Sequence, residues 1–98
     1  MQMYAIMRRN GWSTREELDE AGERSNHERE DEMKGELRWI SSYFFREEDG
    51  SLGTICLYEA ESTDAIREHA RRAGLPADEI LPTFEAVVNR PDPQPAPA

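Results

Sequence analysis

The sequence predicts an α+β domain of the ferredoxin-like class, in which two helices cover one face of a four-stranded antiparallel sheet in the order βαββαβ. Two strand-like segments, 37–45 and 54–59, alternate in side-chain character and flank a polar link with two glycines, as in a hairpin. One helical segment precedes this pair and another follows it, and each meets a glycine at its end. Shorter strand-like segments near both ends of the domain complete the order.

The first strand is expected over residues 1–8, a short run with apolar side chains on both faces. Ser13 and Glu16 then have the spacing of a capping box, and acidic residues in the following turn complement the helix dipole. The first helix should therefore begin at Ser13 and run to residue 33 or 34, with Gly35 as its stop.

The segment 37–45 is rich in aromatic side chains, which favour strands. Strict alternation places one set on a common face and the intervening residues on the other. That set is Leu37, Trp39, Ser41, Tyr43 and Phe45. After the link 47–53, residues 54–59 are expected to return as a third strand, antiparallel to the second.

The second helix is expected from residue 63 to residue 73, because Ser62 is a good N-cap and Gly74 is placed to end it. Residues 76–80 are predicted as one helical turn and residues 84–89 as the fourth strand. A single domain should thus span residues 1–90, followed by a disordered, proline-rich tail over residues 91–98.

The net charge and the cysteine content of the chain limit the kinds of molecule and compartment that are expected for it. The chain carries 21 Asp and Glu against 12 Lys and Arg, a formal net charge of −9, which disfavours nucleic acid and anionic membrane surfaces. A single cysteine, Cys56, allows no intrachain disulfide, and the chain has neither a signal-peptide pattern nor a long apolar run. We therefore expect a cytoplasmic protein without nucleic-acid or membrane partners.

The small core favours association with a second copy. Only 37% of the 98 residues are hydrophobic, and a domain of this size buries about two thirds of its unfolded surface. An aromatic sheet face on so small a domain needs a cover. The sequence therefore predicts a homodimer, arranged as a dimeric α+β barrel.

Over about residues 1–93, with upstream matches such as Tyr4 and Arg8, and most clearly from Cys56 to Ile80, the chain resembles a family of small bacterial domains, common in actinobacteria, that carry a CxYEAP…REHARRAGxPA block. The matching residues are Cys56, Tyr58, Glu59, Ala60, the run 67–74, Pro76, Ala77 and Ile80. The function of this family is unassigned, and one branch of it is described as nickel-binding. The resemblance implies a ferredoxin-like fold and, as the leading functional hypothesis, a protein that binds a divalent metal, nickel in the first place.

Three residues are candidate metal ligands under this hypothesis: His69, Glu59 and His27. His69 lies on the apolar side of the second predicted helix, and His27 lies among carboxylates of the first. Imidazole and carboxylate groups suit nickel as ligands. Both histidines also have simpler interpretations, His69 as a hydrogen-bonded packing residue and His27 as part of a solvated acidic surface.

The competing hypothesis is a cofactor-free enzyme or small-molecule-binding protein with a pocket between sheet and helices. Trp39, Tyr43 and Tyr58 would form its aromatic wall, Arg29 or Arg67 would contact an anion, and His69 would act as acid or base. No organic cofactor and no known catalytic template is predicted from the sequence.

Arg29 bears directly on this choice. It falls on the core-facing row of the first helix, where an apolar residue is expected. Either the helix is irregular there, or the charge lines a cavity and requires a polar or anionic partner.

Overall fold

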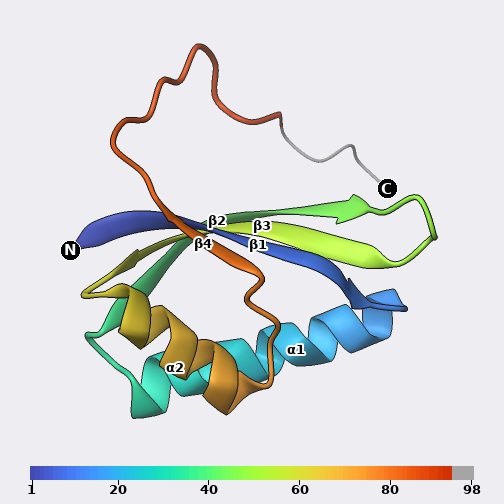
Figure 1. Cartoon of the computed structure of the whole chain (residues 1–98), viewed down its shortest axis with the longest axis horizontal. Helices are drawn as coiled ribbons and strands as arrows, with labels where there is room; N and C mark the ends of the chain where they lie inside the picture. The colour runs from blue at the N-terminus through green and yellow to red at the C-terminus, as the bar shows by residue number, and fades with distance from the viewer. Residues whose placement is uncertain (94–98) are drawn as a thin grey trace.

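The computed structural model describes residues 1–93, so residues 94–98 of the predicted tail lie outside it. Four strands form one antiparallel sheet in the order β2-β3-β1-β4, and helices α1 and α2 cover one face of it (Figure 1). The strands are β1 (Gln2–Trp12), β2 (Leu37–Arg46), β3 (Leu52–Ala60) and β4 (Glu79–Pro82), and the helices are α1 (Arg15–His27) and α2 (Thr63–Ala73). The predicted ferredoxin-like fold is confirmed.

The first helix begins one residue later than predicted and ends irregularly. Thr14, not Ser13, is the N-cap, and its side chain accepts a hydrogen bond from the backbone N–H of Glu17 at 3.2 Å. The Glu17 carboxylate accepts from the backbone N–H of Ser13 at 3.0 Å, so Glu17 is hydrogen-bonded to two successive residues at the helix start. After His27 the chain widens into a π-helical turn, η1 (Glu28–Glu32).

The second helix follows its local signals. The Ser62 hydroxyl caps its start by accepting from the backbone N–H of Ala65 at 3.1 Å. Gly74 ends it in the left-handed conformation, with φ of 69°, which suits a residue without a side chain. The helix therefore occupies the residues that the sequence predicted.

Strict alternation along β2 was a wrong expectation. Trp39 pairs with Tyr58, but the next pair joins Ser41 to Leu57, so a β-bulge inserts one extra residue. Beyond that point the faces exchange, because a one-residue shift moves each side chain to the opposite face. Trp39 faces the helices, whereas Tyr43, opposite Ile55, lies on the face away from the helices, here called the outer face.

The fourth strand and the turn before it were also predicted wrongly. Residues 76–78 form no helical turn, and the strand lies at Glu79–Pro82, not at 84–89. The register explains the difference: Pro82 already lies opposite Tyr4, so β1 offers almost no partner backbone beyond residue 83. The following chain rises on the outer side of the sheet (Figure 1) and leaves three large apolar side chains exposed: Phe84, Val87 and Val88.

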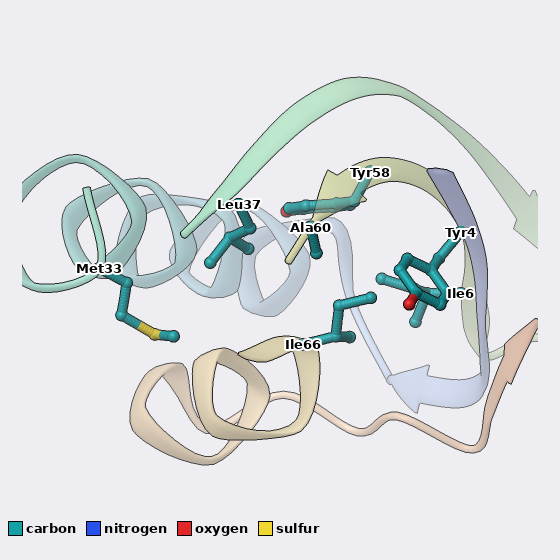
Figure 2. Packing of buried hydrophobic residues seen from close by; sticks show 7 residues of the cluster. All are labelled: Tyr4, Ile6, Met33, Leu37, Tyr58, Ala60 and Ile66. Carbon is teal, nitrogen blue, oxygen red and sulfur yellow. The ribbon is translucent and has the colours of Figure 1, made fainter. Parts of the chain in front are cut away.

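Apolar side chains between the helices and the sheet form two clusters. The larger (Figure 2) contains Tyr4, Ile6, Met33, Leu37, Tyr58, Ala60 and Ile66. The smaller contains Trp12, Leu18, Ala21 and Leu52. Between the two, Arg8 on β1 lies opposite Thr54 on β3, and both are buried. The core is therefore interrupted by a polar layer, and this layer positions the candidate site.

Within the described residues, no helix has the length and apolar character needed to cross a membrane. The boundary predicted at residue 90 stays a prediction.

Candidate functional site

A cavity of about 230 Å³ lies between α1 and the helix-facing side of β1, β2 and β3. Its lining combines aromatic side chains with arginine, serine and threonine, and it includes no aspartate or glutamate. This is notable in a chain with 21 acidic residues. The local field of the cavity is therefore set by its arginines, while the protein as a whole is anionic.

Arg8 is the most unusual side chain of this cavity. Its place follows from the strand period, because Tyr4, Ile6 and Arg8 all point from β1 toward the helices. Only 2% of Arg8 is exposed, and its Nε and Nη2 atoms are buried without a hydrogen-bond partner. A buried cation without a counter-charge is strongly unfavourable, so this position is not explained by stability.

A network of four side chains continues the polar layer from Arg8 toward α2. Ser25 Oγ on α1 lies 3.3 Å from the Tyr58 hydroxyl and 3.2 Å from His69 Nε2. Arg29 Nη1 donates to both Ser25 Oγ, at 3.2 Å, and Tyr58, at 3.3 Å. The hydroxyls of Ser25 and Tyr58 share one hydrogen bond, which uses only one of their two protons. The other hydroxyl proton can be donated to a further acceptor.

The surroundings of His69 fix the position of its ring proton and favour the neutral form. Its Nε2 lies 3.1 Å from the backbone carbonyl of Ser25, which can only accept, so Nε2 carries the proton. Burial lowers the pKa of His69 below its usual value, the hydrogen bond to Ser25 opposes this, and Arg8 and Arg29 lower it further. The neutral imidazole is thus a hydrogen-bonded part of the core, one contact removed from the cavity.

This environment predicts a pH-dependent stability. Because the pKa of His69 is lowered on folding, the unfolded chain binds more protons below pH about 6.5, and stability should fall as pH decreases through that value. Thermal unfolding of the wild type between pH 7.5 and 5.5 should show a steeper loss of melting temperature than the His69→Gln variant. Equal slopes in the two proteins would contradict a neutral, buried imidazole.

Arg29, which is anomalous on its helix row in the sequence, lies both in an irregular part of the helix and beside the cavity. The helix is irregular there, since Arg29 belongs to the π-helical turn, and the side chain also lies against the cavity with only 10% of it exposed. Its guanidinium stacks on Trp39 at 5.5 Å, donates to the Asn26 side chain at 2.8 Å and lies 3.7 Å from the Glu30 carboxylate. Both alternatives that the sequence left open are therefore realised.

The candidate metal ligands lie apart. His69 is buried where α2 packs against α1. Glu59 lies on the outer face of the sheet and pairs with Arg38. His27 is exposed, with Nδ1 2.8 Å from the Asp31 carboxylate. Over residues 1–93, no three side chains of His, Cys, Asp or Glu converge in a way that could hold a metal ion. A nickel ion therefore has no complete ligand set within this part of a single chain.

The cavity gathers three of the five predicted pocket residues: Trp39, Tyr58 and Arg29. Tyr43 is turned to the outer face by the bulge, and Arg67 is exposed on α2. Arg8 is not among the site residues predicted from the sequence. A charged residue in phase with Tyr4 and Ile6 on a buried strand was the signal that could have identified it.

Comparison with known proteins places the chain in a family. Residues 4–82 match the family model described as "Nickel responsive protein SCO4226-like". The crystal structure of SCO4226 from Streptomyces coelicolor A3(2) is similar, with a TM-score of 0.66 and 20% sequence identity, over 87% of this chain and 99% of that one. No curated protein matches the chain. Because the family model covers most of the chain, the protein belongs to the nickel-responsive, SCO4226-like family.

Proposed function

We propose that this protein binds a small organic anion in the cavity between α1 and the sheet. The observation that carries the proposal is the guanidinium of Arg8, which is buried, unpartnered and placed in a cavity without carboxylates. An anionic group on a ligand would supply the missing counter-charge and accept charge-assisted hydrogen bonds from Nε and Nη2. His69 does not line the cavity, so it acts as a positioning residue for Ser25 and Tyr58.

The proposal predicts that binding depends on Arg8 and not on its neighbour. In a titration followed by the backbone amide resonances of Arg8 and Thr54, acetate or inorganic phosphate should produce saturable shifts in the wild type. Arg8→Met should weaken this binding at least tenfold, about 1.4 kcal/mol. Arg9→Met is the matched control, because Arg9 is exposed and paired with Glu47 at 2.9 Å.

Saturable binding that is equally strong in Arg8→Met would place the anion elsewhere. Absence of saturable binding by acetate, by inorganic phosphate and by larger carboxylates would retire the anion-binding proposal.

A second candidate function is nickel binding, favoured by the family to which the chain belongs. One chain offers an incomplete set of ligands in its described part, so water or another molecule would have to fill the remaining positions around the ion. The exposed His27–Asp31 pair is the best half-site, since it already joins one imidazole to one carboxylate. We therefore propose that a nickel ion binds at this pair on the helix side, and that the protein forms a homodimer in the cytoplasm through a separate surface.

The outer face of the sheet is the surface that we propose for this dimer. Tyr43 and Leu81 are about half exposed there. The chain after β4, whose residues Phe84, Val87 and Val88 are exposed, runs on the same side of the sheet (Figure 1). Covering such a surface with a second copy would give the dimeric α+β barrel that the sequence predicts. Sedimentation at micromolar concentration should show a dimer, and a monomer there would contradict it.

The nickel candidate has an internal control on α1. Asp31→Asn should weaken nickel binding at least tenfold, because it removes one ligand. Asp19→Asn should leave nickel binding unchanged, since Asp19 is equally exposed and belongs to an i,i+4 pair with Arg15 instead of a histidine. Native mass spectrometry of untagged protein with added nickel reports metal and subunit number together. A nickel-free spectrum would remove this candidate and leave anion binding unaffected.

A further inference from the structure

The charges around the cavity limit the ligand to one anionic group. Arg8 has no partner, whereas Arg29 donates to Asn26 at 2.8 Å and lies 3.7 Å from the Glu30 carboxylate. One buried cation thus remains without a counter-charge. A planar guanidinium matches a carboxylate with two parallel hydrogen bonds, so a single carboxylate satisfies the site. A phosphate would bring up to two negative charges to one unpaired cation.

The walls of the cavity are suited to a flat ring. Trp12 and Leu18 line it and are almost fully buried, and Trp39, Phe44 and Tyr58 contribute further aromatic surface. Aromatic rings pack against one another in offset or edge-to-face arrangements. The volume of about 230 Å³ lies below the roughly 300–1,000 Å³ typical of drug-sized ligands, so a ligand with one small ring is expected.

The open side of the cavity lies between α1 and the edge strand β2. The exposed residues of its lining are Gly22 and Asn26 on α1 and Trp39 and Phe44 on β2. Each of these two aromatic rings makes a cation–π contact with an arginine. The guanidinium carbon of Arg29 lies 5.5 Å from the ring centroid of Trp39, and that of Arg15 lies 5.4 Å from the ring centroid of Phe44. The arginine contacts hold both rings at the entrance.

We propose that the ligand is a planar aromatic monocarboxylate that enters between α1 and β2. Its carboxylate binds Arg8, and its ring packs among Trp12, Trp39 and Phe44. The free hydroxyl proton of the Ser25 and Tyr58 pair is a further donor for an acceptor on the ring or its carboxylate. This inference rests on the proposed function, because it names the class of anion that the same cavity takes.

The test is calorimetric titration of the full chain with benzoate, cyclohexanecarboxylate, acetate, benzamide and inorganic phosphate. Benzoate should bind at least tenfold more tightly than acetate, cyclohexanecarboxylate and phosphate, and benzamide, which has the same ring without the charge, should not bind saturably. Phe44→Leu should reduce the preference for benzoate over acetate at least threefold. Phe84→Leu is the matched control, because Phe84 is 98% exposed and lies outside the cavity.

The outcomes separate this inference from the proposed function. If acetate and benzoate bind equally and Arg8→Met abolishes both, the aromatic class is overturned and anion binding stands. Tighter binding of phosphate than of benzoate overturns the carboxylate and again leaves anion binding intact. If no anion binds saturably, both proposals fall. A further outcome is that benzoate binds Arg8→Met and Phe44→Leu as tightly as it binds the wild type. That result would overturn both the proposed orientation of the ligand and the cavity as its binding site.

Discussion

Replacing Arg8 with methionine is expected to raise the melting temperature of the unliganded protein. The guanidinium is 2% exposed and leaves Nε and Nη2 without partners, so the folded state carries an uncompensated desolvation penalty. Methionine has a similar length, no charge and a flexible side chain that fills irregular space. Replacing buried charges by apolar side chains stabilises other proteins by roughly 1–4 kcal/mol. We expect about 1–2 kcal/mol here, or about 5–15 °C for a domain of this size.

Arg9→Met supplies the control for this stability measurement. Arg9 is exposed and forms two hydrogen bonds with the Glu47 carboxylate, at 2.9 and 3.0 Å, so its loss should lower the melting temperature slightly or leave it unchanged. Saturating anionic ligand should raise the melting temperature of the wild type and leave that of Arg8→Met unaffected. An Arg8→Met variant that melts below the wild type would show that the guanidinium is satisfied within the fold and would remove the argument for a ligand.

Gly53→Ala is expected to have the opposite and comparably large effect. A Cβ atom at Gly53 would lie 2.7 Å from the ring of Phe45 and 2.8 Å from the backbone oxygen of Arg8. The ring can turn aside, but the backbone oxygen belongs to the paired strand β1 and can move only with it. Forcing atoms into a packed site costs about 1–3 kcal/mol, which should appear as a lower denaturation midpoint in urea.

Gly22→Ala is the matched substitution on α1. A Cβ atom there meets nothing within 4 Å, and alanine is favoured over glycine in a helix by roughly 0.5–1 kcal/mol. The two glycine variants should therefore shift the unfolding midpoint in opposite directions, measured without ligand because Gly22 lies at the entrance of the cavity. A Gly53→Ala protein as stable as the wild type would contradict the close approach of β1 and β3.

Part of the candidate site could be predicted because its residues stand out locally. Arg29 is anomalous on a core-facing helix row, and Trp39 and Tyr58 are aromatic residues of predicted strands. All three line the cavity. Tyr43 does not, because its face depends on the bulge after Trp39, which depends on how β2 pairs with β3. The metal ligands were proposed from residue type, which carries no information on whether side chains converge.

The sequence by itself determined those features whose causes lie within a few residues along the chain. Helix α2 is the clearest, since Ser62 and Gly74 satisfy its end groups locally, and the order of elements follows from hydrophobic period and turn residues. Only the tertiary structure decided the register of β4 against β1, the bulge in β2, and the meeting of Ser25 with His69 from 44 residues away. These depend on pairing and packing between distant segments, where the free energy of the whole arrangement, not local preference, selects the geometry.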